Sequence, residues 1–196
     1  MRGIVFILSG PSGVGKDAIR DRLKQEDFPI TFCVTATTRE PRPGEVHGVH
    51  YLFVSEDEFT RMEQRNELLE RAVVHGQRYG IPRSQVRDGL ERGLDLLITV
   101  DVQGGATLRR ELPQAVSMFL APPNIDALLP RLAIRGTETD EQKAVRLANA
   151  KWEMAQLSSY DYSVVNEQGR LDEAVDCVKA IITAERCRVV PALVTL

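Results

Sequence analysis

The sequence predicts a three-layer α/β/α fold with a parallel core sheet, because short apolar segments alternate with amphipathic ones. Four segments are apolar at almost every position, which predicts buried strands at Ile4–Leu8, Leu94–Val100, Val116–Ala121 and Tyr162–Val165. Helical patterns are expected at about Gly15–Lys24, Gln103–Glu111, Asn124–Ile134, Asp140–Leu157 and Leu171–Arg188. Strands that alternate with helices favour a parallel sheet covered on both faces.

The region from about 32 to 93 breaks this alternation. Strand patterns occur at Phe32–Thr37, Val49–Val54, Leu68–His75 and Arg78–Tyr79. Pro41 and Pro43 forbid a helix between the first two, and Ser55 with Glu58 has the spacing of a capping box that opens a helix. We therefore expect a small mixed α+β insertion on the parallel core.

Length and composition limit the organisation of the chain. Of the 196 residues, 43% are hydrophobic, which is enough to form one folded core. The charged fraction of 27% is too low for a disordered chain. We expect one domain over 1–188, with its core at about 1–31, 94–123 and 158–188, the insertion at about 32–93 and a helical segment at about 124–157. The tail at 189–196 has no assigned role.

Charge and cysteine usage exclude several classes of partner. The net charge of -3 argues against a nucleic-acid binder but permits a small anionic ligand. The three cysteines are odd in number and widely spaced, so they form neither a disulfide framework nor a metal site. Ile4–Leu8 is too short for a membrane span or a signal-peptide core. We therefore expect a cytoplasmic protein that binds neither a membrane nor a nucleic acid.

A glycine-rich loop directly follows the first strand and opens a helix. Its residues are Gly10, Pro11, Ser12, Gly13, Val14, Gly15 and Lys16. The glycines let successive backbone N–H groups point at phosphate oxygens, and the lysine adds a full positive charge near the β- and γ-phosphates. Strand, spacing, lysine and helix together predict a P-loop NTPase fold with a nucleotide site, rather than an ordinary glycine turn.

Asp17 departs from the usual pattern of this loop, in which Ser or Thr follows the lysine and contacts Mg²⁺. A carboxylate is also a hard oxygen ligand that suits Mg²⁺, and it is favourable at a helix N-terminus. Without a metal it would repel phosphate. Asp17 therefore predicts a stronger dependence of activity on Mg²⁺ than a serine would give.

A second group of residues suits a second anion. Arg39 and Arg42 flank Pro41, which stiffens the backbone so that both guanidinium groups can face one phosphate. Tyr51 and Tyr79 carry hydroxyl groups that can donate to the same anion. Taken singly, each arginine could be a solvated charge and each tyrosine a packing residue.

The whole arrangement resembles the guanylate kinase family over roughly residues 1–188. The matching segments are Gly10–Lys16, Thr35–Gly48, Tyr51, Val54–Phe59, Glu70, Tyr79-Gly80, Val100–Gly104, Arg131, Arg135–Thr139, Arg146 and Val165-Asn166. The resemblance implies transfer of the γ-phosphate of ATP to GMP, with Mg²⁺ as cofactor. It implies that the mixed insertion is the GMP-binding region.

The resemblance also implies roles for individual residues. The GMP ligands would be Thr35, Arg39, Arg42, Tyr51, Glu70, Tyr79 and Asp101. The ATP ligands would be Gly10, Pro11, Ser12, Gly13, Val14, Gly15, Lys16, Asp17, Arg131 and Asn166. Catalysis would depend on Lys16, Arg39, Arg135 and Arg146, and Mg²⁺ would be held by Asp17 and Asp101.

The chemistry of Glu70 fits a guanine. A carboxylate accepts hydrogen bonds from the adjacent N1–H and N2–H₂ donors of guanine, whereas adenine has an acceptor at N1 and no amino group at C2. AMP would leave the carboxylate unpaired, so its rejection should be strong. Three positions depart from the family pattern: Thr35-Ala36 replaces a Ser-Ser pair, Ile81 stands where Ser or Thr is usual, and Thr99 stands where an Asp often occurs.

The resemblance implies that the helical segment at about 124–157, after the third core strand, forms a lid. Arg131 and Arg135 lie four residues apart on one helical face, and Arg146 is on the helix that follows. On that helix Val145, Ala148, Trp152 and Ala155 form an apolar stripe, which predicts that Trp152 is in the core. In the family the lid arginines reach the transferred phosphate, although a solvated basic face is the alternative.

Two other functions remain open on the sequence alone. Some domains of this type are non-catalytic protein-interaction modules, but those typically lose loop residues and lid arginines that are present here. A related kinase of ribose 1,5-bisphosphate also carries Asp after the loop lysine, yet does not require the tyrosines and Glu70. The chain could be a monomer or a homodimer.

Overall fold

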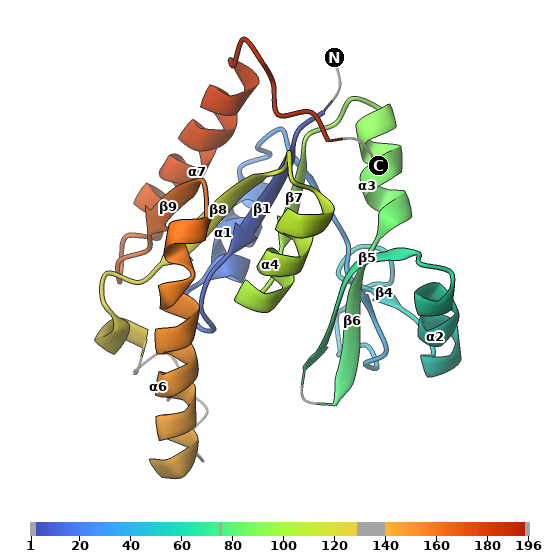
Figure 1. The fold of residues 1–196 in the computed structure, drawn as a ribbon, viewed down its shortest axis with the longest axis horizontal. Helices are drawn as coiled ribbons and strands as arrows, with labels where there is room; N and C mark the ends of the chain where they lie inside the picture. Colours follow the sequence, from blue (N-terminus) through green and yellow to red (C-terminus); the bar gives the residue numbers. More distant parts are fainter. Residues whose placement is uncertain (1–2, 75, 129–139, 195–196) are drawn as a thin grey trace.

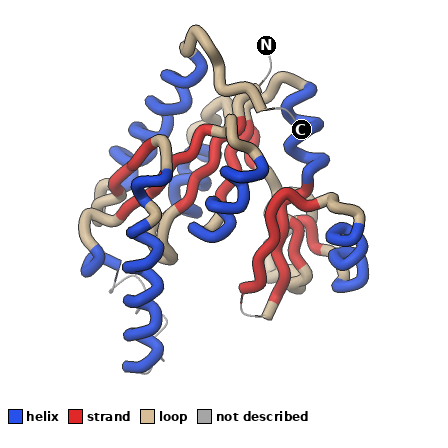
Figure 2. The backbone as a smooth tube through the Cα atoms, viewed as in Figure 1, coloured by secondary structure: helices blue, strands red, loops and turns tan. Residues whose placement is uncertain are grey.

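The computed structural model describes residues 3–74, 76–128 and 140–194 (Figures 1 and 2). Its core is a five-stranded sheet in the order β2-β7-β1-β8-β9, and all four strand pairings are parallel. The strands are β1 (Val5–Ser9), β2 (Thr31–Phe32), β7 (Leu96–Thr99), β8 (Val116–Ala121) and β9 (Tyr162–Val165). The predicted α/β fold with a parallel core sheet is confirmed.

Helices cover both faces of this sheet. Phe6 and Leu8 of β1 pack with Ile19 of α1 (Lys16–Gln25) and Val178 of α7 (Leu171–Arg186). Val5 and Ile7 face the other way and share a cluster with residues of α3 (Arg83–Glu91) and α4 (Val102–Glu111). In the view of Figure 1, α4 lies in front of the sheet and α1 behind it. Two-sided burial explains why β1 is apolar at nearly every position.

A second, mixed sheet forms the insertion. Its order is β4-β3-β6-β5, built from β3 (Ala36–Thr37), β4 (Leu52–Phe53), β5 (Leu68–Val74) and β6 (Gln77–Pro82). β3 and β4 are parallel, and the other pairs are antiparallel. The helix α2 (Glu56–Gln64) packs on this sheet through Phe59, and the Ser55 hydroxyl caps it by accepting from the Glu58 N–H at 3.1 Å.

Two long elements extend from the carboxyl-terminal edge of the core sheet. One is the mixed sheet with α2, and the other is α6 (Asp140–Ala155), as Figures 1 and 2 show. Ligands of open α/β sheets bind at this edge. Short 3₁₀ turns at Ile125–Ala127 and Leu157–Ser159 complete the fold near α6. No helix in the described ranges is long and apolar enough to cross a bilayer.

Several local predictions were wrong. The strand predicted at Phe32–Thr37 is divided between the two sheets, since Phe32 pairs with Leu97 and Ala36 pairs with Gly80. The helix α3 was missed. Of the helix predicted at Asn124–Ile134, the described part is a 3₁₀ turn, and residues 129–134 lie outside the described part of the chain.

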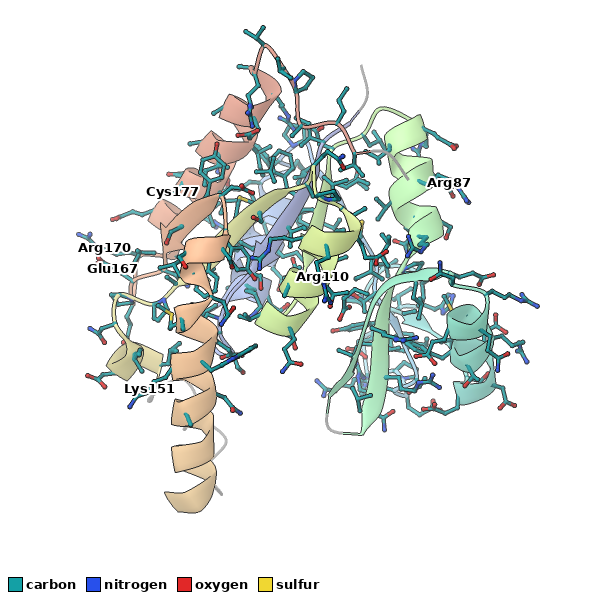
Figure 3. All side chains as sticks on the ribbon, viewed as in Figure 1. Arg87, Arg110, Lys151, Glu167, Arg170 and Cys177 are labelled. Carbon is teal, nitrogen blue, oxygen red and sulfur yellow. The ribbon has the colours of Figure 1, made fainter. Side chains whose placement is uncertain are left out.

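Trp152 is not in the core, because its side chain is 49% exposed. α6 instead turns Ala150 and Met154 inward, and Met154 packs against the cluster that contains Phe119. Lys151, labelled in Figure 3, points outward from the same helix. In the tail, Val189 is 99% exposed whereas Val194 is buried among the core residues of the α3 and α4 face.

Candidate functional site

The glycine-rich loop lies between β1 and α1, as the sequence predicts. Gly10 has φ +149°, and a Cβ there would lie 2.2 Å from the Leu120 carbonyl oxygen, so only glycine lets the loop pass β8 this closely. Gly15 has φ +104° and caps α1 in a left-handed conformation. These two glycines therefore determine the backbone conformation where the chain leaves β1 and where it enters α1.

Lys16 is held over the loop backbone. Its Nζ donates to the carbonyl oxygens of Gly10 at 2.6 Å and Pro11 at 3.0 Å. Burial lowers the pKa of Lys16, and the carboxylates of Glu153, Asp101 and Asp17 oppose this effect. The loop thus presents a buried ammonium group surrounded by acidic side chains.

Glu153 is a site residue that sequence reasoning missed. It lies on α6, far along the chain from the loop, yet its carboxylate is near enough to the Ser12 backbone N–H and to Lys16 for both to lower its pKa. Burial raises the pKa of Glu153, and these two contacts lower it in part. No motif in the sequence signals this carboxylate, since tertiary packing brings it to the loop.

Asn166 follows β9 and supports the loop. Its side chain is 6% exposed, and Nδ2 donates to the Val14 carbonyl oxygen at 2.7 Å. A Cβ at Gly15 would lie 2.6 Å from this amide nitrogen, so a glycine is needed there for the contact. The sequence led us to expect Asn166 as an ATP ligand, and the structure places its amide against the loop backbone.

The two predicted metal ligands differ in their surroundings. Asp101 follows β7 and caps α4, with Oδ1 accepting from the Gly104 N–H at 2.7 Å. Asp17 is in the first turn of α1, exposed, and pairs with Arg20 at 3.2 Å. Among the described residues, no three His, Cys, Asp or Glu side chains form a metal-binding group. A metal here would need substrate phosphates and water to complete its oxygen ligands.

Glu70 is a buried carboxylate on β5 that faces α4. It is 6% exposed, and among the described residues none donates a hydrogen bond to its carboxylate. Burial, and secondarily the nearby Asp101, raise its pKa to about 7. A Cβ at Gly104 would lie 3.0 Å from Glu70 Oε1, so the glycine leaves room for the carboxylate. A cavity of about 180 Å³ borders Glu70 and lies between β5, α3 and α4.

The predicted arginine and tyrosine group gathers beside the mixed sheet. The Arg39 guanidinium lies 5.2 Å from the Tyr51 ring centroid, and the Tyr51 and Tyr79 rings are 6.1 Å apart. Hydrogen bonding to Glu45 and then to Tyr79 raises the pKa of Arg39 above its usual value. Arg42 is exposed on the adjacent loop. The structure therefore brings Arg39, Tyr51 and Tyr79 together, with Arg42 three residues from Arg39.

The three positions that depart from the family pattern have separate environments. Thr35 is half-buried, and its backbone carbonyl accepts from the Leu52 N–H at 2.9 Å. Ile81 is buried in the core cluster on the face of α3 and α4, so its side chain contributes packing. The Thr99 hydroxyl is buried without a hydrogen-bond partner in the described part of the chain.

The lid arginines cannot be placed. Arg131 and Arg135 lie outside the described residues, and Arg146 belongs to α6 with a side chain that also lies outside them. The part of α6 that carries Glu153 is described, and it approaches the glycine-rich loop.

Charge links the two anion sites. Asp101 affects both the pKa of Lys16 at the loop and the pKa of Glu70 on β5. Burial is the main cause that raises the pKa of Tyr51. Asp17 of α1 raises this pKa further, and Arg20 of α1 lowers it. Asp101 is thus within electrostatic reach of both Lys16 and Glu70, and α1 is within electrostatic reach of Tyr51. Ligands of open α/β sheets bind at the carboxyl-terminal edge of the sheet, where the loop lies.

Comparison with known proteins agrees with this geometry. The sequence model of the family described as "Guanylate kinase" matches residues 2–185. "Guanylate kinase 2, chloroplastic/mitochondrial" of Oryza sativa subsp. japonica is 46% identical over 95% of this chain, and the chain spans 66% of that protein's length. "Guanylate kinase" of Halalkalibacterium halodurans is 43% identical, over 95% of this chain and 91% of its own length.

A solved structure agrees as well. The crystal structure of guanylate kinase from Anaplasma phagocytophilum superimposes with a TM-score of 0.74 at 30% sequence identity, covering 96% of this chain and 88% of the other. Sequence, fold and site geometry lead to one conclusion: the chain belongs to the guanylate kinase family.

Proposed function

We propose that this chain is a nucleoside monophosphate kinase that transfers the γ-phosphate of ATP to GMP, giving ADP and GDP. The observation that carries the proposal is Glu70, which is 6% exposed, borders a cavity and accepts no hydrogen bond at its carboxylate from the described residues. The paired N–H donors of a guanine edge would complement the two oxygens of this carboxylate, which no described side chain engages. Membership of the guanylate kinase family supports the same reaction.

The donor nucleotide would bind at the glycine-rich loop. The loop amides and Lys16 would hold the phosphates of ATP, and Asn166 would keep the loop in shape through its bond to the Val14 carbonyl. In this structure Lys16 donates hydrogen bonds to two loop carbonyls. On binding ATP it would replace at least one of these bonds with a bond to a phosphate oxygen.

The acceptor would bind beside the mixed sheet. Arg39, Arg42, Tyr51 and Tyr79 would hold the GMP phosphate, while Glu70 would select the base. Thr35 and Asp101 would also contact GMP. The phosphate of GMP is ionised at neutral pH, so the acceptor needs positioning and charge neutralisation rather than a general base.

A divalent metal is general for phosphoryl transfer in this family, and we propose Mg²⁺. The carboxylates of Asp17 and Asp101 are hard oxygen ligands near Lys16, and both fit Mg²⁺ if phosphate oxygens complete its ligand set. Bound there, the ion would neutralise phosphate charge. Arg131, Arg135 and Arg146 would close over the nucleotides from the lid at about 124–157 and exclude water.

An ADP-release assay with alternative acceptors tests the proposal. The acceptors are GMP, AMP, UMP and ribose 1,5-bisphosphate, each with ATP and Mg²⁺. We expect turnover with GMP and very little with AMP, because adenine cannot donate two hydrogen bonds to Glu70. Turnover confined to ribose 1,5-bisphosphate would overturn the proposal in favour of a sugar-phosphate kinase.

A further inference from the structure

The loop between β3 and β4 contains a carboxylate, Glu45, that binds two groups of the loop at once. Its Oε1 accepts from Nη2 of Arg39 at 2.8 Å, and its Oε2 accepts from the backbone N–H of Arg42 at 2.7 Å. One carboxylate therefore joins the side chain of one arginine to the main chain of the other. Pro41, Pro43 and a left-handed Gly44 (φ +87°) shape the turn that makes this possible.

These contacts hold the Arg39 guanidinium from several sides. Nη1 donates to the Glu40 carbonyl oxygen at 2.7 Å, and the guanidinium carbon lies 5.2 Å from the Tyr51 ring centroid and 5.7 Å from that of Phe53. The Arg39 side chain is only 14% exposed. An unrestrained arginine loses much rotamer freedom when it binds an anion, and this loss weakens binding.

Glu45 leaves room on the guanidinium for a ligand. An arginine has five N–H donors, more than Glu45, the Glu40 carbonyl and Tyr79 engage on Arg39, so the remaining ones can bind phosphate. Hydrogen bonds from Arg39 and from the Arg42 N–H lower the pKa of Glu45 to about 2, so it is ionised at neutral pH. The ion pair between Glu45 and Arg39 is therefore available at the pH of the assay.

We infer that Glu45 is a positioning residue for the acceptor phosphate: it fixes the Arg39 guanidinium and the Arg42 backbone before the nucleotide binds. The inference rests on the proposed function, because Arg39 and Arg42 act there on the GMP phosphate. The opposite role would be competition, in which Glu45 occupies Arg39 and must be displaced by the phosphate. The two roles predict changes of opposite sign in the KM for GMP.

Glu45→Gln tests the inference, and Glu40→Gln is its matched control. The control removes the same charge from the same loop, but Glu40 contacts Arg39 only through its backbone carbonyl. For Glu45→Gln we expect the KM for GMP to rise about tenfold, as for loss of a charge-assisted hydrogen bond that orders a ligand-binding side chain. The KM for ATP should stay within about twofold of wild type, because the contact is remote from the loop that binds ATP.

Each outcome decides the question. A rise in the KM for GMP in Glu45→Gln alone supports the inference. Equal KM values for GMP in both variants, a lower value in Glu45→Gln, or equal rises in the KM for GMP and for ATP overturn it. If Glu45→Gln does not fold, Glu45→Asp replaces it: the shorter side chain keeps the charge but cannot bridge both groups, so an unchanged KM for GMP overturns the inference. Lack of GMP turnover by the wild-type protein refutes the proposed function instead.

Discussion

Glu70→Gln separates the cost of a buried charge from its use in recognition. Gln keeps the size and shape of Glu and removes its charge. Glu70 is 6% exposed, and burial together with Asp101 raises its pKa from 4.5 to about 7. Between about pH 4.5 and pH 7, Glu70 is therefore mainly protonated in the folded protein and mainly ionised in the unfolded chain.

The sign and size of the effect on stability follow from proton linkage. Because the folded pKa is raised, the contribution of Glu70 to stability is fully present below about pH 4.5 and is lost as the pH rises through about 7. The difference between 4.5 and about 7 corresponds to a loss of about 3 kcal/mol in the free energy of unfolding. Glu70→Gln has no proton to lose at this position, so it escapes this loss.

Urea unfolding of both proteins between about pH 5 and pH 8 measures the effect. From about pH 5 to pH 8 the stability of the variant relative to the wild type should rise by about 2 to 3 kcal/mol. The reason is that between about pH 4.5 and pH 7 Glu70 is ionised mainly in the unfolded chain, and most of that interval lies within this range. In the same variant, kcat/KM for GMP should fall about 100-fold, because Gln keeps only one acceptor oxygen, opposes a guanine N–H with its own NH₂ group and lacks the charge. If the free energies of unfolding of wild type and variant changed with pH in the same way, Glu70 would not be a buried carboxylate with a raised pKa.

Three further substitutions test other parts of the site. Asn166→Leu removes the hydrogen bond to the Val14 carbonyl, and we expect it to lower the free energy of unfolding by about 1–3 kcal/mol in urea and to raise the KM for ATP. Asp17→Ser should make the rate less steeply dependent on Mg²⁺ concentration, because a carboxylate without metal repels phosphate; an unchanged Mg²⁺ titration would contradict its role as a ligand. Arg146→Ala should lower kcat by about 100-fold with much less effect on the KM for GMP in steady-state assays. The reverse pattern would remove Arg146 from the transfer step.

The core sheet could be predicted because its sequence signal is local. Ile4–Leu8 is apolar at each position, and β1 is buried on both faces, so pattern and structure express the same constraint. The glycine-rich loop was equally predictable. Gly10 passes the Leu120 carbonyl so closely that no other residue fits, and this requirement is visible as a glycine in the sequence.

The sequence predicted less well those features of the fold that are decided by contacts between distant segments. Nothing within Phe32–Thr37 marks the point where the chain leaves one sheet for another, because every residue there suits an extended strand. The stripe that contains Trp152 has helical spacing, but α6 packs through Ala150 and Met154, which give a second helical face. A period alone does not decide which of two faces meets the core.

The acidic side chains near Arg39 and Lys16 were the least predictable part of the candidate site, and their ionisation differs. Glu45 is held ionised by Arg39, whereas burial raises the pKa of Glu153 beside Lys16 and lowers that of the lysine. The arginine site is thus charged and ordered before its ligand arrives. Around Lys16, burial disfavours the charged forms of both the lysine and Glu153, and Nζ already donates to two loop carbonyls. For the phosphate binding proposed above, Arg39 is therefore prepared by an ionised partner, whereas Lys16 must exchange a loop carbonyl for its ligand.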